Sequence, residues 1–172
     1  AFSLLEGALH LSDIVKLAKA DGQPAVAVTD RANLFGALEF SEKAASAGLQ
    51  PILGCELSVD FGEADEPRGR GGPPTPPQIV LLARSQEGWG NLVKLVSRAY
   101  LASERTGHVA TDLAQLGDLV GGLLALTGWR EGPLGEALLK DRHEVARARL
   151  AALKERFGDA LYAEVQRHPS AP

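Results

Sequence analysis

Apolar residues recur along the chain in two patterns, one typical of amphipathic helices and one typical of buried strands. The first helical stripe runs from Ser12 to Ala20, and Ser12 or Asp13 can cap its open amides. The run from Ala25 to Val28 follows it and is apolar without a polar face, as in a strand covered on both sides. The same patterns predict helices over Leu34–Ala47, Gln86–Leu101 and Glu144–Arg156. They predict strands over Ile52–Val59, with an interruption at Gly54-Cys55-Glu56, and over Ile79–Ala83, Leu123–Leu126 and Leu161–Val165. Strands that alternate with helices predict an α/β fold with a mainly parallel sheet.

One stretch interrupts this alternation. Residues 61–77 read FGEADEPRGRGGPPTPP, and glycine and proline at this density disfavour both helix and strand. We therefore expect a mobile surface loop at about residues 61–77 within a single domain that spans residues 1–172.

Charge and cysteine content narrow the class of protein. The formal net charge is −4, whereas proteins that bind nucleic acid without regard to sequence are usually basic. Cys55 is the only cysteine, so no intrachain disulfide can form, which is typical of a cytoplasmic protein. No apolar run approaches the ~20 residues that span a bilayer.

Several polar residues follow the predicted strands directly. Asp30, Glu56, Trp129 and His168 each stand just after a predicted strand. Chemistry in α/β folds gathers at the carboxyl ends of strands, so these positions predict a site on one face of the sheet.

Longer blocks of sequence resemble one protein family. These blocks are FSLLEGA (residues 2–8), PAVAVTD (24–30), NLFGALEF (33–40), GLQPILGCE (48–56), IVLLARSQEGWGNLVKLVSRAYL (79–101) and LYAEVQRH (161–168). They are similar to blocks of the PHP (polymerase and histidinol phosphatase) domain of bacterial DNA polymerase III alpha subunits, and they occur in the same order.

The resemblance implies a distorted (β/α)7 barrel of which this chain holds only a part. The family's first strand, with its H-x-H pair, and a later Asp-x-His pair would lie outside the chain, as would the catalytic aspartates of the polymerase. The implied parent protein is a DNA-directed DNA polymerase, a magnesium-dependent nucleotidyltransferase of DNA replication. The fragment is expected to be inactive on its own.

The resemblance also implies a degenerate metal site. Metal-bearing PHP domains resemble hydrolases whose metals are held by histidines, carboxylates and sometimes cysteine. Arg31 stands where the family has histidine, and a guanidinium cannot ligate a metal. Trp129 stands where family members often have cysteine, while the remaining family positions are kept as Glu6, Asp30, Glu56 and His168. We expect no bound metal and assign no catalytic residue, with residual zinc or manganese as the alternative.

Each retained residue also has an ordinary structural interpretation. Glu56 can pair with a cation such as Arg31, Asp30 can cap the following helix, and His168 can be a plain polar residue. A fixed positive charge among the carboxylates would balance their repulsion, so we expect Arg31 within salt-bridge reach of Glu56 or Glu6.

Three functions remain open from the sequence. The leading one is a non-catalytic, structural and partner-binding PHP domain. Its partners would be the rest of the polymerase chain and the proofreading exonuclease subunit, and DNA would be contacted through the parent polymerase. The second is a metal-dependent phosphoesterase or 3′–5′ proofreading exonuclease. The third is the error-prone polymerase branch of the family, in which Thr-Asp-Arg also occurs.

Overall fold

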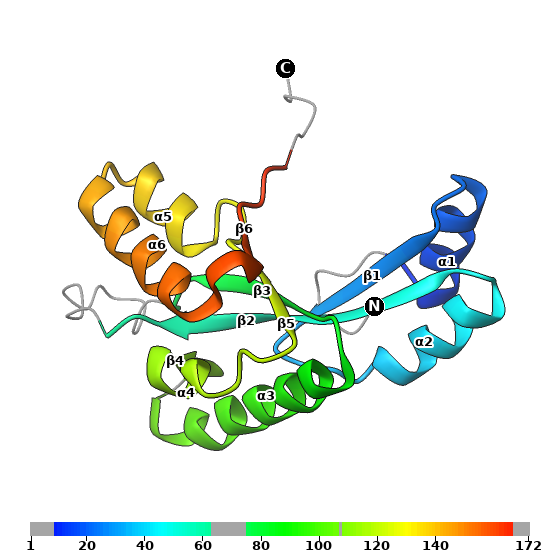
Figure 1. Cartoon of the computed structure of the whole chain (residues 1–172), viewed down its shortest axis with the longest axis horizontal. Coiled ribbons are helices and arrows are strands. Elements are labelled where there is room, and N and C mark those ends of the chain that lie inside the picture. Colours follow the sequence, from blue (N-terminus) through cyan, green and yellow to red (C-terminus); the bar gives the residue numbers. More distant parts are fainter. Residues whose placement is uncertain (1–8, 63–74, 107, 167–172) are drawn as a thin grey trace.

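The structure, a computed structural model, describes residues 9–62, 75–106 and 108–166 (Figure 1). The helices are α1 (Leu11–Ala20), α2 (Ala37–Ser46), α3 (Gln86–Thr106), α4 (Leu113–Gly117), α5 (Pro133–Leu139), α6 (His143–Phe157) and a 3₁₀ turn η1 (Gly158–Ala160). The strands are β1 (Ala25–Arg31), β2 (Gln50–Asp60), β3 (Gln78–Ala83), β4 (Ala110–Asp112), β5 (Leu123–Leu126) and β6 (Leu161–Tyr162). Most of the expected loop at 61–77 lies outside the described residues.

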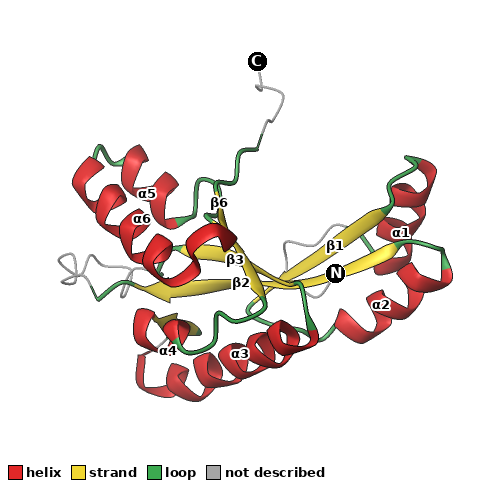
Figure 2. Cartoon of the chain, viewed as in Figure 1, coloured by secondary structure: helices red, strands yellow, loops and turns green. Residues whose placement is uncertain are grey.

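The strands form one six-stranded mixed sheet in the order β1-β2-β3-β5-β6, with β4 paired to β2 (Figure 2). The α/β class is confirmed, but the expectation of a mainly parallel sheet is wrong in the centre. There β3 runs antiparallel to both β2 and β5. The reason is visible in the sequence, because residues 61–77 carry no helical pattern, and a connection without a crossover helix favours an antiparallel neighbour.

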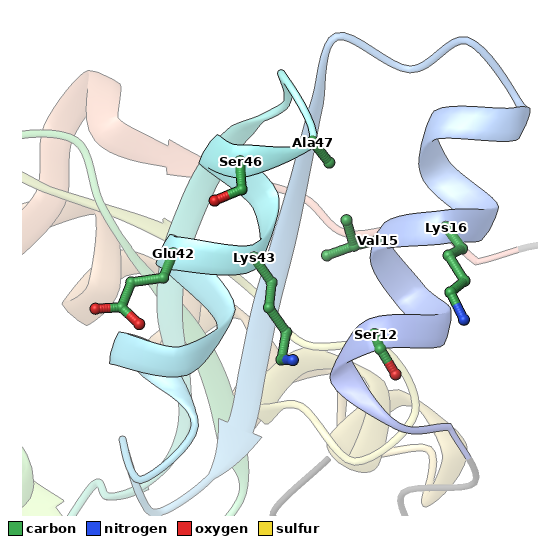
Figure 3. A pocket seen from close by; sticks show the side chains of 7 residues that line it. All are labelled: Ser12, Val15, Lys16, Glu42, Lys43, Ser46 and Ala47. Atoms are coloured by element: carbon green, nitrogen blue, oxygen red, sulfur yellow. The ribbon is translucent and has the colours of Figure 1, made fainter.

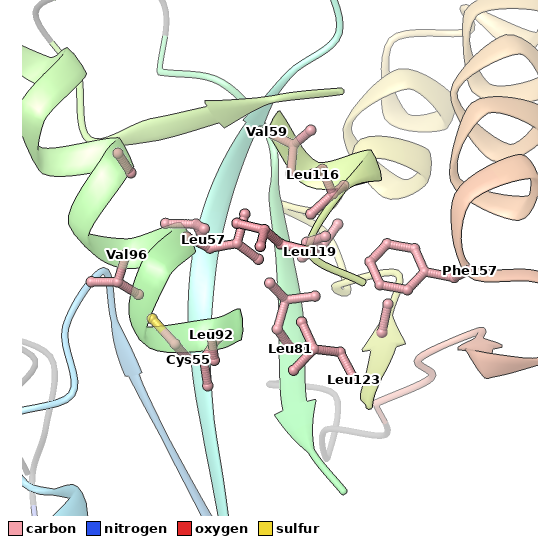
Figure 4. Packing of buried hydrophobic residues seen from close by; sticks show 14 of the residues in the cluster. Cys55, Leu57, Val59, Leu81, Leu92, Val96, Leu116, Leu119, Leu123 and Phe157 are labelled. Atoms are coloured by element: carbon pink, nitrogen blue, oxygen red, sulfur yellow. The ribbon is translucent and has the colours of Figure 1, made fainter. Parts of the chain in front are cut away.

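Helices cover one face of the sheet and form the main hydrophobic core (Figure 4). Side chains alternate along a strand, so Cys55, Leu57 and Val59 share one face of β2, and all three are fully buried. Leu92 and Leu95 of α3 belong to the same cluster. Further members come from α4, α6 and the strands β3 and β5: Ile79, Leu81, Leu116, Leu123, Ala125, Leu153 and Phe157.

A second, smaller cluster lies at the other end of the molecule, where α1 and α2 pack on β1. Its buried members are Leu11, Val15, Ala18, Val28, Phe40, Ala44 and Leu49. In Figure 1 this end projects from the body that carries α3 to α6.

Two expected helix starts were wrong. The first helix begins at Leu11, one residue before Ser12, with His10 as N-cap and no side-chain cap. The second begins at Ala37 after Gly36, three residues later than expected. Asn33 explains the delay, because its side chain accepts from Phe35 N at 3.2 Å and holds residues 33–35 in a turn.

Three short elements gave no periodic signal in the sequence, namely β4, α4 and α5. Asp112 caps α4 by accepting a hydrogen bond from Gln115 N at 2.7 Å, and Pro133 starts α5.

The last strand is shorter than expected and ends at Tyr162, and Val165 is exposed. No helix within the described part of the chain is long and apolar enough to cross a membrane.

Candidate functional site

Arg31 lies between two carboxylates on the face of the sheet opposite the main core. Its Nε donates a hydrogen bond to Oε2 of Glu56 at 3.1 Å, and its Nη2 donates to Oε2 of Glu131 at 3.0 Å. The side chains of Arg31 and Glu56 are 34% and 29% exposed, and that of Glu131 is 72% exposed. The expectation that Arg31 reaches Glu56 is confirmed.

The strand register brings Arg31 and Glu56 together. The parallel ladder of β1 and β2 sets Arg31 beside Glu56, so both side chains leave the same face. The Glu56 carbonyl also accepts from Ala32 N at 2.8 Å, which continues the ladder by one bond. Glu56 is not at a strand exit as expected, because β2 continues to Asp60.

Glu131 is a site residue that the sequence reasoning missed. It lies in the loop after β5, and its carbonyl accepts from Gln78 N at 3.0 Å, at the start of β3. Gly128 shapes this loop with a φ of +64°, and a Cβ there would stand 2.4 Å from the Gln78 carbonyl oxygen. A carboxylate placed by a loop has no periodic signature. The only sequence signal was that Glu131 stands two residues after Trp129, which was itself a predicted site position.

The turn that follows β1 fixes the backbone of Arg31. Asn33 Nδ2 donates to the Arg31 carbonyl at 2.9 Å, and Ala32 has a left-handed φ of +54°. Asn33 is itself buried. A turn held by a buried side chain keeps Arg31 aimed at the two carboxylates.

Asp30 does not join this site. It is in register with Cys55, and residues in register share a face, so Asp30 faces the core side while Arg31 faces the opposite side. Its side chain is buried. The expectation that Asp30 caps the next helix is wrong, because α2 begins only at Ala37.

Cys55 is a buried thiol in the main core. Burial raises the pKa of Cys55 to about 12, and the negative charges of Glu56 and Asp30 act in the same direction. The backbone N–H groups of Asn33 and Ala32 lower the pKa, but by less. The thiol is therefore protonated at neutral pH and is not a nucleophile.

The other predicted site positions are only partly accounted for. Trp129 is half-buried, and the Arg130 guanidinium lies 5.6 Å from the centre of its ring. Glu6 and His168 lie outside the described residues. The structure thus brings together Arg31 and Glu56 from the predicted set, and adds Glu131.

The residues around Arg31 do not fit a metal ion. The described ranges contain no group of three or more histidine, cysteine, aspartate or glutamate side chains that could hold one. A guanidinium, which has donors and no lone pair to offer, stands between Glu56 and Glu131. Among the described residues, the set around Arg31 therefore does not fit a metal ion.

A separate open groove of about 420 Å³ runs between α1 and α2 (Figure 3). Val15 points toward α2, and Lys16 and Lys43 stand at the groove, each within 4 Å of an acidic neighbour on its own helix.

Comparisons with known proteins identify the family. A model of the PHP domain family matches residues 1–168. The chain is 40% identical over 173 residues to the DNA polymerase III subunit alpha of Caulobacter vibrioides, covering 98% of this chain and 14% of that protein. It is also 40% identical over 170 residues to the corresponding subunit of Thermus aquaticus, covering 97% of this chain and 14% of that protein. Among solved structures, an amidohydrolase from Chromobacterium violaceum matches with a TM-score of 0.40 and 20% identity, over 87% of this chain and 45% of the other. On the family match and the two polymerase relatives, the chain belongs to the PHP domain family.

Proposed function

We propose that this chain is the PHP domain of a DNA polymerase III alpha subunit and that it acts there as a structural, partner-binding domain. The similarity to two such subunits covers nearly the whole chain but only 14% of their length. Polymerase activity, its magnesium and the grip on DNA would reside elsewhere in the parent protein, in keeping with the acidic charge of this chain.

The observation that carries the proposal is the position of the Arg31 guanidinium. It donates hydrogen bonds to Glu56 and Glu131 at 3.1 and 3.0 Å. Its positive charge offsets the repulsion between the two carboxylates, so no metal ion is needed between them. A guanidinium holds its charge at all accessible pH values and cannot activate a water molecule as a metal ion does. The site is suited to holding β1, β2 and the loop after β5 together, and it is poorly suited to hydrolysis.

The face of the sheet opposite the main core is partly exposed, and this favours the binding of another protein segment there. By register, Leu82, Leu124 and Leu126 lie on the face that carries Glu56, and each is only partly buried, whereas Val80 on the same face is buried, so this face is exposed only in part. Tyr162 on the same face is 53% exposed. Within the described residues β1 and β6 end the sheet without pairing to each other, so the sheet is open there. We propose that the rest of the polymerase chain covers this face, which would complete the barrel, and that the proofreading exonuclease subunit is a further partner.

Two assays on the purified chain test this proposal. The first measures release of nucleotides from single-stranded DNA, and hydrolysis of a simple phosphodiester, with zinc or manganese added. We expect no turnover above that of the metal alone. Metal-dependent turnover that disappears in Glu56→Gln would instead establish the phosphoesterase or proofreading exonuclease alternative.

The second assay measures complex formation by size-exclusion chromatography after coexpression with the cognate proofreading exonuclease subunit. We expect coelution. Failure to coelute, with a folded domain, would contradict the partner assignment. The full sequence of the parent protein separates the replicative from the error-prone branch.

A further inference from the structure

The two hydrophobic clusters divide the described chain into two parts that share no buried residue. The first part consists of α1, β1, α2 and the start of β2, residues 11–53, and is called here the N-terminal lobe. The second part consists of residues 54–62, 75–106 and 108–166, and is called the body. Figure 1 shows the lobe projecting at one end, away from α3 to α6. The lobe cluster has seven buried residues and the body cluster has fifteen.

The β1–β2 ladder is the main connection between the lobe and the body, because Thr29, Asp30 and Arg31 are in register with Gly54, Cys55 and Glu56. Strand β2 passes through both, with Leu53 packed on the lobe cluster and Cys55 already in the body cluster. Leu34 is the lobe residue that packs against the body cluster. The pairs that Arg31 makes with Glu56 and Glu131 are the described salt bridges between the two parts, and they are partly exposed. Partly exposed ion pairs contribute little free energy, so the lobe is held mainly by its own small core and by the β1–β2 ladder.

The body can remain folded without the lobe. After loss of β1, strand β2 still pairs with β3 and β4, and the body cluster keeps all of its members. The lobe, in contrast, has a small core, and small cores give small opening free energies.

We propose that the N-terminal lobe opens as a cooperative unit while the body stays folded. The hinge lies in β2 between Leu53 and Cys55, and Arg31 is the closing contact. Opening withdraws Arg31 from Glu56 and Glu131, so that two carboxylates are left without their shared cation.

Hydrogen exchange of the whole chain, followed by mass spectrometry, tests the proposal with two matched variants. Ala44 of α2 and Ala99 of α3 are both fully buried in helices, one in each cluster. Replacing either by glycine weakens its helix by a similar amount, equivalent to about a fivefold change in an equilibrium constant. An unchanged far-UV circular dichroism spectrum of each variant shows that the helices of both parts are folded.

The proposal predicts different patterns for the two variants. Ala99→Gly weakens the closed form and the lobe-open form equally. Lobe amides should therefore exchange at the wild-type rate, while amides of α3, β3 and β5 exchange about fivefold faster. Ala44→Gly weakens only the closed form, so both lobe and body amides should exchange about fivefold faster.

Two results would overturn the proposal. One is an Ala99→Gly protein in which lobe amides accelerate as much as body amides, because this is the behaviour of a single cooperative unit. The other concerns the wild-type chain at low denaturant, and needs no variant. Lobe amides that are as strongly protected as those of α3 would exclude a separate opening.

Discussion

Arg31 and Glu131 stand 100 positions apart in the sequence, yet Nη2 of the arginine lies 3.0 Å from Oε2 of the glutamate. The Glu131 carbonyl accepts from Gln78 N on β3, and β2 lies between β1 and β3. At least two strand spacings, about 10 Å, therefore separate the two backbones. Only long side chains can meet over that span. A planar guanidinium can in addition contact Glu56 and Glu131 at once, which a lysine ammonium on its stem does less well.

Removing the guanidinium should destabilise the protein. Arg31→Ala leaves Glu56 and Glu131 without their shared partner, but all three groups are partly exposed. We therefore expect a loss of about 1–2 kcal/mol in the free energy of unfolding, below the cost of a fully buried pair. Urea unfolding measures it. Arg147→Ala serves as control, because Arg147 is 80% exposed and 3.8 Å from Glu144. Equal effects of the two variants would show that the Arg31 pairs add nothing.

The two carboxylates should contribute unequally. Glu56→Gln should cost about 1 kcal/mol, because Glu56 is more buried and is held in the strand ladder. Glu131→Gln should cost less than about 0.5 kcal/mol and should become neutral at 1 M salt, because Glu131 is 72% exposed. Unfolding of both variants at low and high salt gives the comparison. A larger loss of unfolding free energy in Glu131→Gln than in Glu56→Gln would contradict this, because it would show that the loop carboxylate is the stronger partner of Arg31.

The α5–α6 contact should weaken in acid. Burial raises the pKa of Glu136, but hydrogen bonds and positive charge from Lys140 and Arg149 outweigh burial and leave that pKa below its ordinary value. A carboxyl group with a lowered folded pKa stabilises the protein above its unfolded pKa, and that stabilisation is lost as the pH falls through the folded pKa.

The stability difference between wild type and Glu136→Gln should therefore be constant near neutral pH and shrink below about pH 4.5. Unfolding midpoints from pH 7 to pH 3 measure this difference. Curves that stay parallel over the whole range would show that Glu136 does not titrate with folding.

Much of the fold could be predicted from periodicity, and the misses have local causes. The apolar runs Ala25–Val28 and Ile79–Ala83 correctly located the strands Ala25–Arg31 and Gln78–Ala83, because apolar runs of that length leave few alternatives. The direction of β3 was missed. Residues 61–77, which connect β2 to β3, carry no helical pattern, and this favours an antiparallel pair. The start of α2 was missed because Asn33 forms a turn through its own side chain, a local effect that apolar spacing does not encode.

The site was predictable where strands place it and not where a loop does. The pairing of Arg31 with Glu56 could be predicted, because clustered carboxylates without a metal ion need another positive charge beside them. The parallel register of β1 and β2 sets the two side chains next to each other. Glu131 depends on the conformation of Gly128 and on a bond to Gln78, and neither leaves a pattern in the sequence. Asp30 was misplaced because neighbouring residues in a strand face opposite sides.

Histidine at position 31 should not create a tight metal site. An imidazole is shorter than the arginine side chain, so it can approach Glu56 but not the place where Nη2 meets Glu131. The indole of Trp129, which stands where the resemblance implies a cysteine, has no free lone pair to add. Calorimetric titration of Arg31→His with zinc should show no stoichiometric binding. Tight binding of one zinc ion per chain would mean that the site is only one residue away from a working metal centre.

The central claim is that Arg31 takes the place of a metal ion, and metal analysis of the wild-type chain tests it most directly. The purified protein is dialysed against zinc or manganese, passed through a desalting column, and measured by atomic emission against protein concentration. The account predicts far less than one metal ion per chain, with no change in the unfolding midpoint. One or more zinc or manganese ions per chain, together with a raised unfolding midpoint, would contradict it.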